Sequence, residues 1–267
     1  MGAMVDPHAP EATHAAAADA NAGVTLRFIG SGDAFGSGGR LQTCFCVDAP
    51  GLRFLIDCGC SSLIGLAAQG IDPDSVDAIV LTHFHGDHCG GVAFLLFHAM
   101  AVSRRTRALT IVGPTGVQAH VGRLMEVLFP GSAGLRPRFE LRYVEVVPGS
   151  EAELGALRVR SWPALHTAET QPTIVRVQTA GRSIVYTGDT AWTPAIAEAC
   201  EGADLLITEC YYYDTTSRWH LDHATIAARK ASLRARRIVL THPSPAVLER
   251  AALLSETLAH DGLVLTL

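Results

Sequence analysis

The chain has 267 residues, of which 48% are hydrophobic and 18% charged, and 26 acidic against 21 basic residues give a net charge of −5. This is a globular composition, with enough apolar residues for one large core or two layered ones. It argues against a nucleic-acid-binding protein, which usually carries a basic excess. No apolar run reaches the roughly 18 residues that a membrane span requires, so we expect a soluble protein.

The first 22 residues are rich in alanine and lack both the basic start and the apolar segment of a signal peptide. We therefore expect residues 1–22 to be a disordered leader. The seven cysteines are an odd number without an export signal, which favours reduced thiols and a cytoplasmic location. No linker interrupts the remaining chain, so residues 23–267 are predicted to form one domain.

Short apolar strands alternate with helical patterns along the whole domain. In the first half, strands are predicted at residues 24–30, 45–47, 53–57, 78–81, 109–112 and 140–147, and helices at 61–69, 92–102 and 116–129. In the second half, strands are predicted at 157–162, 173–179, 183–187, 205–208, 237–241 and 263–267, and helices at 194–200, 224–234 and 246–260. Two strand-rich halves with helices outside predict two packed sheets flanked by helices.

The stretch LTHFHGDHCGG directly follows the apolar strand predicted at residues 78–81. His83 and His85 are two positions apart, so one tight turn can direct both rings at a single ion. Asp87 and His88 follow where the chain bends into the next helix, and they can reach a second ion. Imidazole and carboxylate are the ligands that zinc and similar ions bind at about 2 Å. The sequence therefore predicts a metal site at the end of this strand.

The motif THFHGDH resembles the HxHxDH signature of the metallo-β-lactamase superfamily, whose fold is an αββα sandwich with a dinuclear site at one edge. The resemblance implies three later ligands at strand ends, and His166, Asp189 and His242 occur in that order. Asp57, in FLIDCG, matches an aspartate that usually orients a ligand histidine without binding metal. The resemblance covers about residues 24–267.

Carried over by position, the resemblance implies two ligand sets that share a bridging carboxylate. One divalent ion would be held by His83, His85 and His166, the other by Asp87, His88 and His242, with Asp189 between them. Zinc is the expected metal, with manganese or iron as alternatives. Lactam-cleaving relatives have a ligand cysteine where this chain has Asp189, so antibiotic hydrolysis is not expected and Cys89 is expected to be a packed residue.

The segment HLDHATIAARKA resembles the region before the last ligand in the ribonuclease Z and cyclic-phosphodiesterase branch, where a histidine protonates the leaving oxygen. His220 has the separation from His242 that is typical of this branch, whereas the residues around His223 match the sequence of the branch's motif better. We favour His220 as the catalytic acid and keep His223 as the alternative. Asp87 is the second expected catalytic residue, orienting the attacking water. Glu209 is a candidate hydrogen-bond partner of the acid histidine.

The resemblance implies a dinuclear metal-dependent hydrolase that acts on small cyclic or linear phosphodiesters and assembles as a homodimer. Relatives that process tRNA typically insert a long arm between the third histidine and the bridging aspartate, but only 23 positions separate His166 from Asp189 here. A nucleic-acid partner is therefore not favoured. Ribonuclease Z-like RNA cleavage stays open, as does lactone, ester or thioester hydrolysis on the same metals. A binding module without chemistry is disfavoured, because all seven ligands are present.

Overall fold

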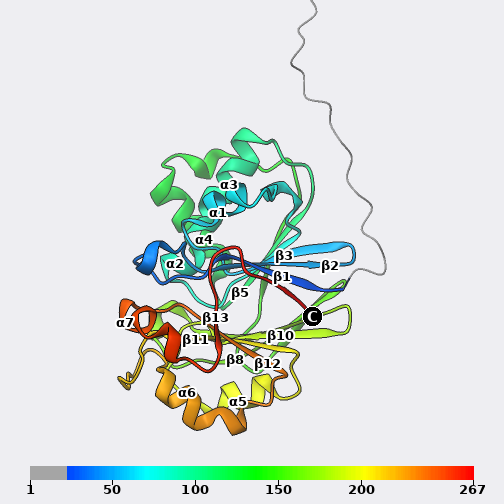
Figure 1. Ribbon diagram of the computed structural model, residues 1–267. Helices are drawn as coiled ribbons and strands as arrows, with labels where there is room; N and C mark the ends of the chain where they lie inside the picture. Colours follow the sequence, from blue (N-terminus) through cyan, green and yellow to red (C-terminus); the bar gives the residue numbers. More distant parts are fainter. Residues whose placement is uncertain (1–22) are drawn as a thin grey trace, which may run out of the picture.

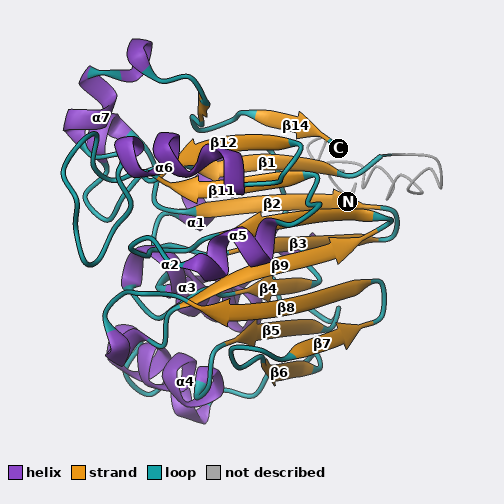
Figure 2. Ribbon diagram, turned by 90° about the horizontal axis from the view of Figure 1, so that it is seen from below, coloured by secondary structure: helices purple, strands orange, loops and turns teal. Residues whose placement is uncertain are grey.

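The computed structural model describes residues 23–267, and the predicted leader at residues 1–22 lies outside the described residues. Two seven-stranded sheets lie face to face, with helices on their outer faces (Figure 1). The strands of both sheets lie broadly along the same direction (Figure 2). The predicted αββα sandwich is therefore confirmed.

The first sheet has the strand order β14-β1-β2-β3-β4-β5-β6 and the second the order β13-β12-β11-β10-β9-β8-β7. The strands of the first sheet are β1 (Thr25–Gly30), β2 (Cys44–Ala49), β3 (Leu52–Ile56), β4 (Ala78–Val80), β5 (Leu109–Gly113), β6 (Leu141–Glu145) and β14 (Val264–Thr266). Those of the second are β7 (Glu151–Leu154), β8 (Leu157–Pro163), β9 (Thr173–Thr179), β10 (Arg182–Tyr186), β11 (Leu205–Glu209), β12 (Arg237–Thr241) and β13 (Thr257–Leu258).

Helices cover both outer faces of the sandwich. Those on the first sheet are α1 (Ser62–Ala68), α3 (Gly91–Phe97) and α4 (Val117–Leu128); those on the second are α5 (Pro194–Cys200) and α6 (His223–Arg229). The short helices α2 (Gly86–Cys89) and α7 (Pro245–Glu249) lie at one edge of the sandwich (Figure 1). None of the helices among residues 23–267 is long and apolar enough to cross a membrane.

The core between the sheets is built from one face of each strand. Phe28 and Phe45 of the first sheet stack edge to face, and Phe45 makes the same contact with Tyr186 of the second, each with ring centroids 4.9 Å apart. Successive residues of a strand face opposite sides of its sheet. In β3, Phe54 points into the core between the sheets, and the next residue, Leu55, packs under the outer helices. Burial on both faces explains why the central strands read as continuous apolar runs.

The chain directions bring several strand ends to one edge. Strand β3 runs parallel to β4, and β10, β11 and β12 run parallel to one another. The loops that leave the carboxyl ends of these strands carry Asp57, His83, Asp189 and His242. Parallel strands present their carboxyl ends on the same side of a sheet, which is where ligands usually bind in such folds.

The structure differs from the sequence prediction in one helix near the C-terminus and in one additional strand at an edge of the second sheet. The helix predicted at residues 246–260 ends at Glu249, and the chain then forms a 3-10 turn and strand β13. The edge of β12 would have unpaired backbone groups without β13, and this pairing satisfies them. Next to it, the N–H of Ala259 donates to the carbonyl of Leu240 at 2.8 Å. Strand β7 was not predicted; it pairs antiparallel with β8.

Candidate metal centre and active site

The seven side chains predicted as metal ligands meet in a single cluster at this edge of the sandwich. The loop after β4 carries two histidines, and the first turn of α2 carries the next aspartate and histidine of the motif. The other three ligands follow β8, β10 and β12. The cluster therefore comprises His83, His85, Asp87, His88, His166, Asp189 and His242, with at least one side chain from each sheet in each ligand group.

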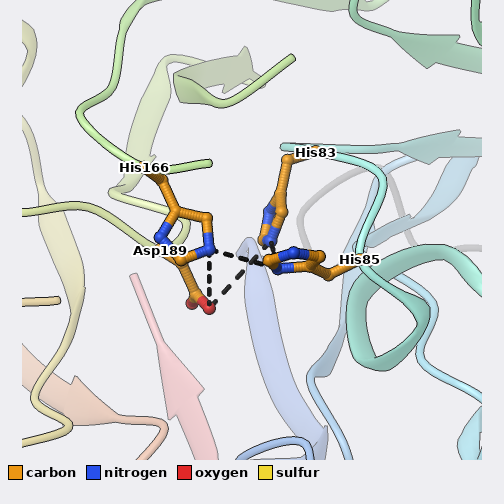
Figure 3. Close-up of side chains that lie close together, drawn as sticks. All are labelled: His83, His85, His166 and Asp189. Carbon is orange, nitrogen blue, oxygen red and sulfur yellow. Dashed lines mark hydrogen bonds and ion pairs between the residues drawn. The ribbon is translucent and has the colours of Figure 1, made fainter. Parts of the chain in front are cut away.

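The first group joins three histidines to Asp189 (Figure 3). The Nδ1 atom of His85 lies 3.2 Å from Nε2 of His83 and 3.1 Å from Nε2 of His166. Oδ2 of Asp189 lies 4.0 Å from Nε2 of both His83 and His166. One nitrogen of each ring thus faces a common point together with a carboxylate oxygen, as in a tetrahedral cation site.

The second group shares Asp189 with the first. Nε2 of His88 lies 3.3 Å from Oδ1 of Asp189 and 3.4 Å from Oδ2 of Asp87. Nε2 of His242 lies 3.2 Å from Oδ2 of Asp87 and 3.6 Å from Oδ2 of Asp189. Because Asp189 belongs to both groups, it has the position that a bridging carboxylate between two cations requires.

Neighbouring acceptors fix which ring nitrogen faces each group. Buried Asp57 accepts from Nδ1 of His88 at 2.7 Å and from the backbone N–H of Thr82 at 2.8 Å. The Nδ1 atom of His166 donates to the carbonyl of Trp219 at 2.7 Å. Both histidines therefore keep Nε2 free for a cation, which is the usual effect of such outer hydrogen bonds. Asp57 has the orienting position that the resemblance implied.

The backbone is strained at two of these positions. Asp57 has φ 56° and His242 has φ 57°, both in the left-handed region that residues other than glycine rarely adopt. At His242 the conformation is held by the backbone N–H, which donates to the carbonyl of Ser31 at 3.0 Å. Strain of this kind persists where surrounding contacts over-determine it, and it concentrates at functional sites.

The buried polar atoms of the cluster fit divalent cations. Nε2 of His88 and Oδ1 of Asp189 are buried and have no hydrogen-bond partner among the described residues, although buried polar atoms are almost always paired. A cation between the groups would satisfy both atoms. Five imidazoles and two carboxylates form a donor set suited to zinc, and also to manganese or iron.

The electrostatic environment favours the protonation state that metal binding needs at His83 and Asp189, whereas at His88 and His242 the charge of Asp189 outweighs burial and raises the pKa. Burial, assisted by the charge of His88, lowers the pKa of His83 well below its ordinary value, so its ring is neutral. Burial alone would raise the pKa of Asp189, but the facing His242 and His88 outweigh it and hold that pKa well below its ordinary value. The cluster therefore presents a neutral imidazole at His83 and an ionised bridging carboxylate.

The two candidate acid histidines lie in different surroundings. Nδ1 of His220 lies 3.0 Å from Oε2 of Glu209 and 3.8 Å from Oδ2 of Asp189, so this ring faces the ligand cluster. His223 instead points its Nε2 at Glu256, 3.1 Å away, and belongs to none of the ligand groups found among residues 23–267. Burial lowers the pKa of His220, and the charge of Asp189 offsets that change only in part.

A cavity of about 320 Å³ lies over the cluster. Its walls include His220 and the candidate ligands His85, Asp87, Asp189 and His242, together with four aromatic residues that the sequence did not single out: Phe35, Tyr211, Tyr212 and Trp219. The available signals were the three consecutive tyrosines at residues 211–213 and the glycine-rich stretch GSGDAFGSGG at residues 30–39. Cys89, by contrast, is buried with its Sγ 3.6 Å from Nε2 of His120 and belongs to none of the ligand groups within residues 23–267.

Comparison with known proteins agrees with this geometry. Residues 52–243 match the family described as the Beta-lactamase superfamily domain, and the chain belongs to that family. A ribonuclease Z from Haloferax volcanii is 27% identical, over 81% of this chain and 83% of its own length. The chain is a metal-dependent hydrolase.

Two solved structures show the same fold. The short form of human tRNase Z superposes with a TM-score of 0.74 at 24% identity, covering 91% of this chain and 98% of its own. A diphosphatase of the PhnP family superposes with a TM-score of 0.71 at 23% identity, covering 91% of this chain and 98% of its own. Proteins of this fold therefore include one named for tRNA and one named as a diphosphatase.

Proposed function

We propose that this protein hydrolyses small cyclic or linear phosphodiesters at a site for two divalent cations, with zinc the expected metal. The observation that carries the proposal is the pair of ligand groups that share Asp189, with His220 facing the same space. A phosphodiester is anionic and gains further charge in its transition state, so two adjacent cations suit it better than any single side chain.

The cations and two side chains, Asp87 and His220, have different roles in the proposed hydrolysis. Two bound cations would lower the pKa of a water molecule and neutralise the phosphoryl oxygens. Asp87 lines the cavity over the cluster, where its carboxylate can accept a hydrogen bond from the attacking water and orient it. His220 has its Nδ1 against Glu209, which leaves Nε2 to deliver a proton to the departing oxygen.

The segment between His166 and Asp189 supports a small substrate. It consists of a short 3-10 turn and the hairpin of β9 and β10, with its turn at Ala180–Gly181, and contains no long inserted arm. The excess of acidic residues, with a net charge of −5, also offers little attraction to a polyanion. A small diester needs neither feature.

RNA cleavage is the second candidate, and the comparisons favour it as strongly. The relative from Haloferax volcanii is named ribonuclease Z, and its similarity covers most of both chains. The same cations and the same acid would serve an internucleotide diester, because the reacting group is identical. The two candidates differ in how the rest of the substrate is bound, and a nucleic-acid partner is part of the second alone.

The proposal is tested by measuring turnover of bis-p-nitrophenyl phosphate beside a panel of lactones, with the zinc-loaded protein. Diester turnover with little lactone turnover supports the proposal, whereas the reverse ranking assigns the site to carbonyl chemistry.

Assembly as a homodimer and a cytoplasmic location stay predictions. Light scattering of the purified protein tests the first, and fractionation of the native cells tests the second.

A further inference from the structure

A second, larger cavity of about 600 Å³ opens beside the ligand cluster. His166 forms part of its wall, so the cavity reaches the first ligand group. Most of the remaining wall is apolar, formed by Pro114, Pro148, Ala164, Leu165, Ala168 and Pro172. Its volume falls in the range of about 300–1,000 Å³ found for small-molecule sites, and hydrolysis of a bare phosphate group would not need it.

The two cavities meet the cluster from different sides. The smaller cavity is lined by His220 but not by His166, and the larger one by His166 but not by His220. Trp219 lines both cavities, so they adjoin at this residue. Since the leaving oxygen must lie beside His220, the leaving group belongs in the smaller cavity. The substituent that stays on phosphorus then points past Trp219 into the larger one.

The wall of the larger cavity around Trp219 has a shape and chemistry that can bind a flat aromatic ring. Trp219 and Leu165 are 39% and 52% exposed, although apolar residues of this size usually avoid water. The guanidinium of Arg218 lies 4.5 Å from the centroid of the Trp219 ring, and Arg218 also lines the larger cavity. An aromatic group can stack on an indole and on a guanidinium plane, whatever its detailed hydrogen-bonding pattern.

We propose that the larger cavity is the subsite for the retained substituent of the diester, and that it takes an aromatic group of about nucleoside size against Trp219 and Arg218. This inference rests on the proposed function. It narrows the substrate class to diesters in which one side of the phosphate carries a nucleoside or a comparable aryl group. The charged phosphate lies at His166, and the ring lies among the apolar wall residues.

The test compares two diesters with the same leaving group. Thymidine 5′-phosphate p-nitrophenyl ester and methyl p-nitrophenyl phosphate both release p-nitrophenol, so only the retained substituent differs. The wild-type protein is expected to prefer the thymidine ester by about 10-fold or more in kcat/KM, the scale of stacking one base on an aromatic side chain. Trp219→Ala should remove most of that preference by lowering kcat/KM for the thymidine ester far more than for the methyl ester, and Trp219→Phe should retain most of it.

Binding of the product gives a readout that is independent of turnover. Thymidine 5′-phosphate should quench the tryptophan fluorescence of the wild-type protein, and methyl phosphate should not. Arg218→Gln should weaken this binding several-fold. Arg229→Gln is the matched control, because Arg229 lies 5.4 Å over the ring of Trp192, outside the cavity, and it should change nothing.

Several results would overturn the inference. One is equal kcat/KM for the two esters in the wild-type protein, and another is an equal loss on both esters in Trp219→Ala, which would make Trp219 a support for His220 only. Absence of quenching would also count against it. If neither ester is hydrolysed, the proposed function fails, and the fluorescence titration still decides whether the cavity binds an aromatic phosphate.

Discussion

Asp57 accepts hydrogen bonds from Nδ1 of His88 and from both the N–H and the hydroxyl of Thr82, and it is fully buried. Asp57→Asn keeps the size of the side chain but removes the charge that holds His88. Loss of such an orienting partner typically weakens metal binding about 10–100-fold. We expect this decrease in a competition titration with a chromophoric chelator.

Asp48→Asn is the matched control for this change, because Asp48 is a half-exposed carboxylate on β2 that pairs with Arg53. It should leave metal affinity unchanged. Equal affinities for the Asp57→Asn and wild-type proteins would show that Asp57 has no orienting role.

His220 is expected to act on the reaction and not on metal binding. His220→Ala should retain metal and reduce turnover by about 10²–10⁴-fold, most for diesters with poor leaving groups, because general-acid help matters most there. Metal content by elemental analysis and rates on a series of leaving groups measure both effects. His223→Ala should have little effect on rate, since His223 pairs with Glu256. A larger loss in His223→Ala would reverse the assignment.

The clustering of the candidate ligands could be predicted from the sequence because their motifs follow recognisable strands, and their role as metal ligands stays a prediction. The aromatic wall could not. Tyr211 and Trp219 reach the cluster only because the segment between β11 and α6 folds back over it, with the ring of Tyr211 4.8 Å from that of His220. Nothing local in the sequence encodes that return, which depends on contacts with loops far away along the chain.

The start of α3, directly after the helix α2 that carries Asp87 and His88, lies tightly against the loop after β3. A Cβ atom added at Gly91 would lie 2.1 Å from the carbonyl oxygen of Gly59, so any side chain there must push α3 away from that loop. Gly91→Ala should therefore lower both the melting temperature and the metal content. Thermal unfolding and elemental analysis measure the two effects.

Gly122 provides the comparison within a helix. It lies in α4 with open space beside its Cα atom, and nothing lies within 4 Å of an added Cβ atom. Gly122→Ala should stabilise the fold by about 0.5–1 kcal/mol, because alanine loses less backbone entropy than glycine. Stabilisation of Gly91→Ala as well would contradict the close packing described for α3.

Helices and strands with a clear apolar period were predictable to within a few residues; β9, β12 and α5 have the predicted bounds. The segment after α7 was not. Residues 246–260 have helical composition, but Glu256 accepts from Lys230 at 2.6 Å, and residues 257–258 pair with the edge of β12. Tertiary contacts decided the conformation there, as they commonly do when local propensity is weak.

The two ligand groups connect both sheets, so the cations should stabilise the whole molecule. We expect close to two equivalents of metal per chain by elemental analysis. Removal by a chelator should lower the melting temperature, since a ligand present at about 1,000 times its dissociation constant contributes about 4 kcal/mol to stability. A melting temperature that is the same with and without metal would show that the cluster does not bind cations in the folded state.

The central claim, a site for small diesters, is tested most directly by comparing bis-p-nitrophenyl phosphate with a precursor tRNA on one zinc-loaded preparation at several salt concentrations. Binding of a polyanion through many cationic contacts weakens steeply with salt, whereas a small diester is held mainly at the cluster. We expect faster turnover of the small diester, a rate that changes little with salt, and weak tRNA binding. Site-specific cleavage of the precursor tRNA at a higher rate than the small diester would contradict the claim.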